Sequence, residues 1–511
     1  MQQESRVKKS LLNARVNLIF YFLTLALSFF SRKIFLDCLG ADFLGLIGTL
    51  GTMLGFLNLA ESGVSSAIAV VLYAPLLERN NIKINEIVSV LGYLYNLIGK
   101  IIFGGGLILA CFFPLIFADA EIGLPIIYLS FFSFLGASLI GYFVNYKQVL
   151  LSADQRNYVV AAYSQSANLI KIMLQMGLAY YTRNYYLWIV IEFLFGILYS
   201  LILNWKIRQV YPWMSSEVKI GKTLYKEYPE VMRYTKQLFI HNIGSVVYTQ
   251  ATPFIVYAFT SLQTVAYYGN YTLITSKLSS LLNNFLGGTS ASVGNLIADG
   301  DKKRILKVYW ELMSIRFLFV GVTVYAMFHL LPAFIALWVG DEYIMSELLL
   351  VLVLISFALS ILRGVTDEFL YGYGLFSDTW SPFVEALILI VVAVIGGSLW
   401  GLEGTLIGSI LSTIIIIYIW KPYFLFNEGL KLSVWKYWRE FSKYLFSLFL
   451  SFFFSELLLK PISGKFAIYN SWLAWILYSF VLVVINLVVC GGLLLIMTKG
   501  TRNLCCRIIK R

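Results

Sequence analysis

Basic side chains occur well inside several long apolar stretches of the chain. Four of them lie on separate stretches, namely Lys100, Lys171, Lys277 and Arg316. A charged group in hydrocarbon is costly, so such residues normally face protein or a water-filled space and are functional candidates. Cations that surround one aqueous cleft attract an anion. We predict that these four bind an anionic substrate. Arg32 is a fifth candidate, although snorkelling to the membrane surface explains it equally well.

Acidic residues in the same stretches offer an alternative, in which each cation is neutralised by a carboxylate. Glu61 lies in the small-residue run "NLAESGVSSA". We expect it either to tether a lumen cation, which keeps its helix in register, or to carry a coupling proton or Na⁺. Arg363 and Asp367 are four residues apart, a spacing that favours an ion pair on one helix. The remaining carboxylates in these stretches, either structural or functional, include Glu192, Glu368 and Glu385.

Motifs for other kinds of chemistry are missing from this sequence. The "GKT" at 221–223 lacks the glycine of a phosphate-binding loop, because Ser216 stands there. The "DGD" at 299–301 resembles the metal-binding carboxylates of glycosyltransferases, but no soluble domain accompanies it to hold a nucleotide sugar. The five cysteines show no metal-ligand spacing with the two histidines. We therefore expect no cofactor, no metal and no enzyme activity.

The elements that carry these charges are membrane-spanning helices. The chain is 59% hydrophobic and 13% charged, and its apolar stretches are two to three times longer than the strands of a membrane barrel. We predict an all-α polytopic membrane protein with about fourteen helices. The predicted spans are 12–34, 43–74, 88–118, 125–147, 158–182, 185–205, 236–259, 265–298, 308–338, 347–373, 380–399, 402–425, 441–459 and 470–498.

The basic charge is distributed unevenly over the predicted connections. One side holds most of the Lys and Arg residues, whereas the other holds three, Arg183, Lys460 and Lys465. This asymmetry predicts that both termini lie in the cytoplasm. It also explains the net charge of +12 by membrane topology, without nucleic-acid binding. The long segment 206–236 is basic and partly amphipathic, as is typical of a segment that lies on anionic lipid head groups.

Two similar halves are indicated by a weak internal repeat. The same residue types occur at the same spacing in both halves, as Gly45, Gly63 and Ala67 in the first and as Gly269, Gly287 and Ala291 in the second. We predict an N-terminal lobe at 1–210 with helices 1–6, a cytoplasmic linker at 211–235 and a C-terminal lobe at 236–426 with helices 7–12. A further helix pair, 13–14, and a basic tail occupy 427–511. Two copies of six helices have the same orientation in the membrane.

The first third of the chain resembles the polysaccharide or O-antigen flippases of the multidrug/oligosaccharidyl-lipid/polysaccharide (MOP) exporter superfamily. The motifs are "SRKIFLDCLGADFLGL" (31–46), "LNLAESGVSSAIA" (57–69) and "LYAPLLERNNIKI" (72–84). Ser62 stands where that family often has Leu, and Ala74 where it often has Lys. The motif resemblance covers about 60 residues.

The resemblance implies a V-shaped, MATE-like pair of six-helix lobes that works by alternating access in the bacterial inner membrane. The cargo would be an oligosaccharide linked to polyprenyl pyrophosphate, for surface polysaccharide biosynthesis. Membrane lipids, a polysaccharide polymerase and chain-length machinery are the implied partners. An inside-negative potential favours export of an anion, by ~2.3 kcal/mol per charge across ~100 mV. A MATE-type drug or cation exporter and a lipid II flippase remain the alternatives.

Overall fold

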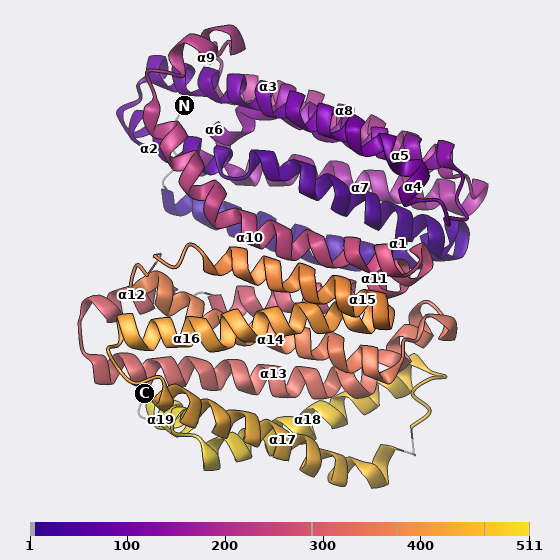
Figure 1. Cartoon of the computed structure of the whole chain (residues 1–511), viewed down its shortest axis with the longest axis vertical. Coiled ribbons are helices and arrows are strands. Elements are labelled where there is room, and N and C mark those ends of the chain that lie inside the picture. Colours follow the sequence, from indigo (N-terminus) through magenta and orange to yellow (C-terminus); the bar gives the residue numbers. More distant parts are fainter. Residues whose placement is uncertain (1–5, 288–289, 376, 464–465, 510–511) are drawn as a thin grey trace. The chain divides into compact units, whose positions relative to one another are not determined.

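The computed structural model describes residues 6–287, 290–375, 377–463 and 466–509, and these residues form helices and connections without a strand. Lys465 of the predicted outer connections therefore lies outside the described residues. The chain divides into two compact units, Met1–Ala266 and Tyr267–Arg511. Each unit is a set of long helices that run side by side (Figure 1).

Unit 1 contains the helices up to α10. They are α1 (Arg6–Leu57), η1 (Asn58–Glu61), α2 (Val64–Glu78), α3 (Asn81–Cys111), α4 (Phe113–Ile116), α5 (Leu124–Phe143), η2 (Asn145–Lys147), α6 (Gln148–Ala153), α7 (Asn157–Thr182), α8 (Tyr185–Val210), α9 (Val218–Leu224) and α10 (Pro229–Phe259). The next helix, α11 (Leu262–Leu286), begins in unit 1 and continues into unit 2.

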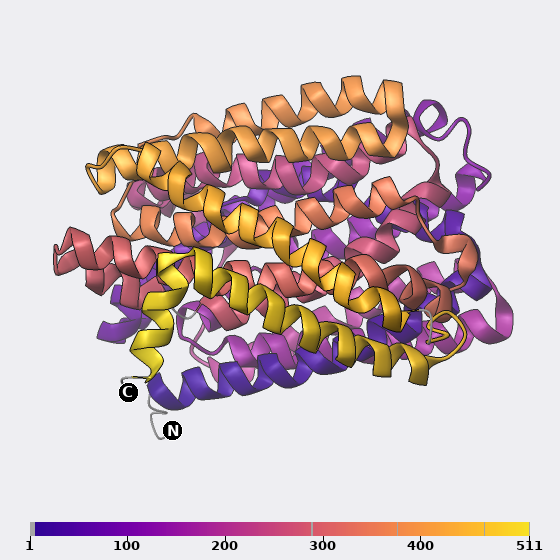
Figure 2. The ribbon, with the colours of Figure 1, turned by 90° about the horizontal axis from the view of Figure 1, so that it is seen from below.

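Unit 2 contains the remaining helices. They are α12 (Ser290–Ala298), α13 (Lys302–Trp338), η4 (Asp341–Tyr343), α14 (Glu347–Gly372), α15 (Ser381–Thr413), the π-helix η5 (Ile414–Trp420), α16 (Lys421–Phe424), η6 (Leu425–Gly429), α17 (Trp435–Ser463), α18 (Trp472–Met497) and α19 (Lys499–Ile509). Figure 2 shows α19 turning away sharply from the end of α18, because Thr498 between them has an extended backbone with ψ of 137°.

Two glycines divide very long helices into pairs of spans. At Gly40 in α1 the backbone has φ of 82° and ψ of 164°, values that glycine adopts far more readily than other residues. In α15 the break lies at Trp400 and Gly401. Beyond it the chain folds back so tightly that a Cβ at Gly404 would lie 1.9 Å from the carbonyl oxygen of Gly396. Glycines at both positions therefore allow the two halves of α15 to pack as a hairpin.

The predicted all-helical membrane architecture is confirmed. Nine stretches of the described residues are long and apolar enough to cross a membrane. Two of these, Leu12–Glu61 and Ser381–Gly429, contain the breaks at Gly40 and Gly401 and so account for four predicted spans. The predicted spans 158–182, 236–259 and 265–298 coincide with α7, α10 and α11–α12, whose sequences are more polar.

The two compact units do not follow the predicted lobe limits. The units divide between Ala266 and Tyr267, whereas the prediction divides the chain at the linker 211–235. The difference is α10, which packs on α1 and α2 of unit 1. Gly63 permits this contact, since a Cβ there would lie 2.8 Å from Cβ of Leu238. The division into two six-helix lobes therefore stays a prediction.

The predicted linker contains α9, which docks on α3. A Cβ at Gly221 would lie 2.0 Å from the carbonyl oxygen of Ser89. The Ser89 hydroxyl also accepts a hydrogen bond of 3.0 Å from the amide of Glu217. Tyr228 donates a hydrogen bond of 2.5 Å to Glu86 at the start of α3. This part of the linker is thus held against protein.

Candidate functional site

Glu61 lies at a break in the helical path between α1 and α2. Ser62 has ψ of 117° and Gly63 has φ of 95°, so neither residue continues the helix. The Glu61 carboxylate accepts a hydrogen bond of 2.6 Å from the Tyr95 hydroxyl and another from the Ser65 hydroxyl. The Ser65 and Tyr95 hydroxyls are themselves 2.7 Å apart. A discontinuous helix thus presents a carboxylate to two hydroxyls inside unit 1.

A second polar group lies beside this carboxylate. Asn58 accepts hydrogen bonds of 3.0 Å from Tyr142 and 3.2 Å from Ser138. The rings of Tyr95 and Tyr142 meet edge to face at 5.5 Å. Within the part of the chain that the structure describes, Glu61 makes no ion pair. The lumen cation that it was expected to tether is therefore not beside it, and both roles considered for Glu61 stay predictions.

Lys171 forms an ion pair in unit 1. Its Nζ lies 2.6 Å from Oε1 of Glu192, which joins α7 to α8. The other carboxylate oxygen, Oε2, accepts a hydrogen bond of 3.0 Å from Gln175, and Gln175 also donates to the Trp188 carbonyl. Less than a fifth of either charged side chain is exposed. The charge of Lys171 is therefore neutralised here, as the alternative interpretation of the sequence expected.

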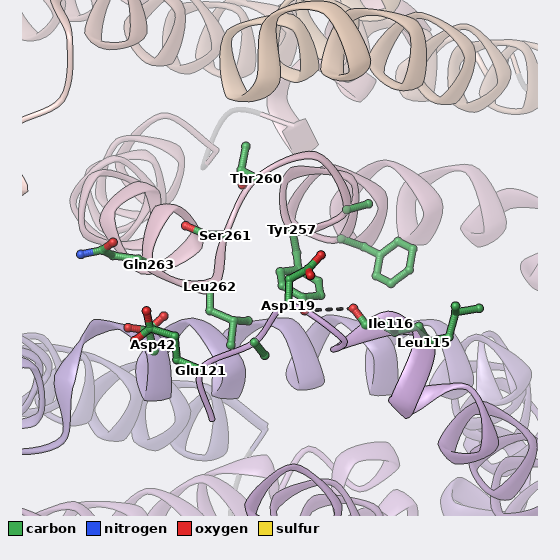
Figure 3. Close-up of a pocket in the computed structure, with 13 residues that line it drawn as sticks. Asp42, Leu115, Ile116, Asp119, Glu121, Tyr257, Thr260, Ser261, Leu262 and Gln263 are labelled. Atoms are coloured by element: carbon green, nitrogen blue, oxygen red, sulfur yellow. Dashed lines mark hydrogen bonds between the residues drawn. The ribbon is translucent and has the colours of Figure 1, made fainter. Parts of the chain in front are cut away.

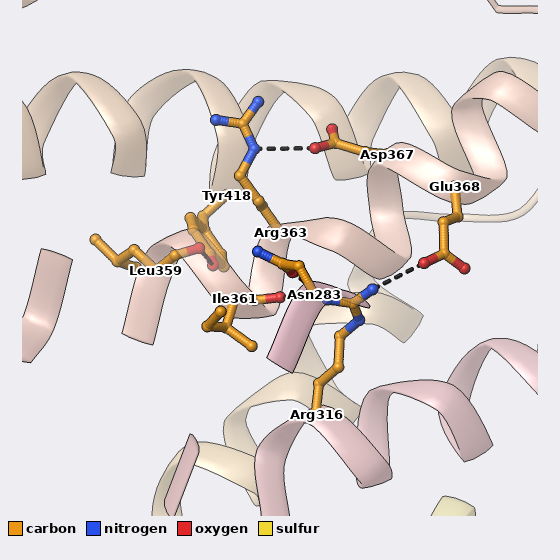
Figure 4. Close-up of polar contacts among 8 residues, drawn as sticks. All are labelled: Asn283, Arg316, Leu359, Ile361, Arg363, Asp367, Glu368 and Tyr418. Carbon is orange, nitrogen blue, oxygen red and sulfur yellow. Dashed lines mark hydrogen bonds and ion pairs between the residues drawn. The ribbon is translucent and has the colours of Figure 1, made fainter. Parts of the chain in front are cut away.

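Arg316 forms the most buried ion pair among the predicted site residues (Figure 4). Its Nη2 lies 2.8 Å from Oε1 of Glu368, with 5% and 10% of the two side chains exposed. Its Nη1 donates to the Ile361 carbonyl at 2.9 Å and more distantly, at 3.5 Å, to Asn283. A Cβ at Gly364 would lie 2.4 Å from Nη1. The absence of a side chain at Gly364 therefore leaves the space on α14 that the guanidinium occupies.

Arg363 and Asp367 form the ion pair that their spacing predicted. Arg363 Nε lies 2.9 Å from Oδ2 of Asp367, and about a third of each side chain is exposed. Figure 4 shows the guanidinium groups of Arg316 and Arg363 directed to different carboxylates. Unit 2 thus holds two neighbouring ion pairs that share α14, one buried and one partly open.

The other predicted cations differ in their surroundings. Lys100 lies exposed on α3 and makes no ion pair with the residues that the structure describes. Lys277 lies on α11 in unit 2 and is partly buried. Arg32 is also partly buried and donates a hydrogen bond of 2.7 Å to the Ala266 carbonyl. Because the four main cations are divided between the units, a single anion cleft that joins them stays a prediction.

Sequence reasoning missed an acidic pocket in unit 1 (Figure 3). It has a volume of about 550 Å³ and is lined by Asp42, Asp119 and Glu121, together with residues 260–263. The Tyr257 hydroxyl, also in its wall, donates to the Ile116 carbonyl at 3.0 Å. These carboxylates lie at a helix break and in connections, where a charge normally indicates nothing more than exposure to water.

Comparisons with known proteins show the fold of this chain. No family model matches the sequence, and no curated protein matches it. A solved structure of the lipid II flippase MurJ in an inward closed conformation is similar, with a TM-score of 0.64 and 14% identity. The similarity covers 94% of this chain and 99% of that one. An inward-facing multidrug resistance MATE family transporter of the MOP superfamily gives a TM-score of 0.59 and 15% identity, with coverages of 81% and 95%. The chain therefore has the helical membrane fold of these structures over most of its length.

Proposed function

We propose that this protein is a flippase for an oligosaccharide linked to polyprenyl pyrophosphate. It would move this lipid from the cytoplasmic to the outer leaflet of the bacterial inner membrane by alternating access. The similarity to a lipid II flippase over 94% of the chain carries the proposal. The MATE transporter covers only 81%, and this difference favours a lipid-linked cargo over a drug. The flippase-like motifs between residues 31 and 84 support the same choice.

The basic residues supply the recognition of the pyrophosphate. Lys100 is the exposed cation and makes the first contact with the anionic head group. Lys171 and Arg316 are held by Glu192 and Glu368 in this structure. A pyrophosphate that reaches either cation competes with its carboxylate, so substrate binding exchanges one ion pair for another. The ion pairs thus keep the cations hydrogen-bonded while the substrate is absent.

The membrane potential supplies a driving force for this movement. In the predicted topology both termini are cytoplasmic, and the outer leaflet lies on the positive side of the membrane. Outward transfer of each negative charge is then favoured by ~2.3 kcal/mol per ~100 mV. The polyprenyl chain stays in lipid throughout, because its burial in protein would bring no gain over a hydrocarbon surrounding.

Reconstitution in lipid vesicles tests this function. The probe is an undecaprenyl pyrophosphate that carries a fluorescent oligosaccharide, and a membrane-impermeant reductant outside the vesicles destroys exposed fluorophores. We expect the protein to make the inner-leaflet probe accessible to the reductant, whereas vesicles with a denatured sample keep it protected. Protection that is equal in both samples would refute the proposal. Fluorescent lipid II as a parallel probe distinguishes the lipid II flippase alternative.

The acidic pocket of unit 1 favours a second candidate function, a cation or drug exporter. Asp42, Asp119 and Glu121 suit a positively charged compound in a cavity of about 550 Å³. Efflux of a cationic dye such as ethidium from the same vesicles tests this candidate. An exporter moves the dye and leaves the glycolipid in place, whereas the proposed flippase does the reverse.

A further inference from the structure

A buried carboxyl group in unit 2 lacks the partners that such a group normally has. Glu385 lies near the start of α15, and 9% of it is exposed. Its Oε1 is fully buried and accepts no hydrogen bond from any residue that the structure describes. An ionised carboxylate in this position would lose its hydration and gain no hydrogen bond at Oε1 in return, which is costly. The neutral, protonated form avoids that cost.

Several charged groups lie in the same part of unit 2 as Glu385. Arg363 and Asp367 lie on α14, which packs against α15, and Lys421 lies at the start of α16, directly after η5. The charges of these three residues act on the Glu385 carboxyl. Lys421 is itself paired with Asp378 at 2.7 Å. These five residues comprise two cations and three carboxylates. Their net charge is −1 when Glu385 is ionised and zero when it holds a proton.

Other polar groups of η5 and α14 already have partners. The Tyr418 hydroxyl, on η5, donates its hydrogen bond to the Leu359 carbonyl at 2.6 Å. The remaining carboxylate on this part of α14, Glu368, is taken by Arg316. A proton needs only one oxygen ligand, whereas a metal cation needs several and would be repelled by Arg363 and Lys421.

We propose that Glu385 is a proton-binding site that couples proton entry to the movement of the glycolipid. The arrangement seen here is that of the protonated form, with Arg363 paired to Asp367. When the Glu385 carboxyl releases its proton to water, Arg363 turns to the new carboxylate and leaves Asp367 to solvent. The exchange is inexpensive, because a partly exposed pair four residues apart on one helix is weak. This role rests on the proposed flippase function, whereas the proton site does not.

Infrared difference spectroscopy of the purified protein in lipid nanodiscs tests the site without any substrate. A protonated carboxyl group has a C=O stretch well separated from that of a carboxylate, so a pH step reveals its titration. We expect this band in the wild type, its loss in Glu385→Gln and its displacement in Glu385→Asp. Glu403→Gln on the same helix is the matched control and keeps the band. A band that is unchanged in both Glu385 variants would overturn the proposal.

The vesicle assay tests the coupling separately. With the fluorescent undecaprenyl pyrophosphate glycan as probe, an acidic exterior should accelerate transport by the wild type severalfold. In Glu385→Gln the rate should be the same with and without the gradient. Stimulation that survives in Glu385→Gln overturns the coupling while leaving the flippase intact. An absence of probe movement at any pH instead refutes the flippase function, and the infrared band still identifies the proton site.

Discussion

Removing the charge of Glu368 should destabilise unit 2 strongly. In Glu368→Gln the side chain keeps its size, but the Arg316 guanidinium, of which 5% is exposed, loses its counter-charge. Its hydrogen bonds to Ile361 and Asn283 remain, yet neither partner carries a charge. Breaking a buried ion pair in this way costs about 3–5 kcal/mol. We expect a decrease of that size in the free energy of unfolding.

Asp367→Asn provides a matched control on the next residue of the same helix. It breaks the Arg363 pair, whose side chains are about a third exposed. After discounting for solvent, the cost should be below about 1 kcal/mol. The double variant Arg316→Met/Glu368→Met removes both buried charges and should recover most of the stability lost in Glu368→Gln.

Equilibrium unfolding in mixed detergent micelles, with SDS as denaturant and tryptophan fluorescence as the signal, measures these differences. The free energy of unfolding should be highest in the wild type, lower in Asp367→Asn and lowest in Glu368→Gln. Equal losses in the two single variants would show that burial of the Arg316 pair does not govern its strength. A double variant less stable than Glu368→Gln would show that the uncompensated charge is not the cause.

Three further predictions concern transport, the proton and the fold. Lys100→Gln should lower the rate of glycolipid movement in vesicles at least tenfold. The control is Lys33→Gln, which should leave the rate unchanged; the Lys33 side chain is about half exposed and lies 3.8 Å from Asp37. Equal rates in the two variants would exclude Lys100 from substrate binding. Glu61→Gln should preserve transport if the carboxylate only holds Ser65 and Tyr95, and a lost dependence on the proton gradient would instead make Glu61 a proton carrier. Gly404→Leu should prevent α15 from forming its hairpin, since a Cβ there meets the backbone of Gly396. The variant should then lose its monodisperse peak in size-exclusion chromatography. The control Gly492→Leu has open space at its Cβ and should keep that peak.

The helices of this fold could be predicted because hydrophobic length directly reports a membrane crossing. Gly40 and Gly401 lie between predicted spans, so the breaks inside α1 and α15 agree with the predicted division. The packing of α10 on unit 1 could not be predicted in the same way. It depends on close contacts such as that of Gly63 with Leu238, which hydropathy does not contain.

The ion pairs could be predicted only in part. Arg363 and Asp367 share a helix, and their spacing was sufficient. Glu192 and Lys171 lie on antiparallel neighbours joined by a short connection, at comparable depths, so a comparison of depths along α7 and α8 could have found this pair. The same comparison applies to Arg316 and Glu368, which lie at nearly the same number of residues from the connection between α13 and α14.

The ion pair between the C-terminal helix α19 and α13 could not be predicted from spacing or depth. Arg507 of α19 lies 2.6 Å from Glu311 of α13, and 2% of the Glu311 side chain is exposed. The sequence assigns Arg507 to a basic tail whose charges serve topology. A buried acidic partner on a helix far away in the chain is determined by how α19 docks, and that docking depends on tertiary packing near Gly500 and Trp310.

If this protein moves a pyrophosphate-linked glycan, the charge of the lipid should govern its transfer. Two fluorescent undecaprenyl lipids with the same glycan, one joined through pyrophosphate and one through a neutral ether, can be compared in the same protein-containing vesicles. We expect rapid transfer of the pyrophosphate lipid, accelerated by a potential that is positive at the receiving leaflet, and little transfer of the neutral lipid. Equal transfer of both lipids, indifferent to the potential, would contradict this expectation.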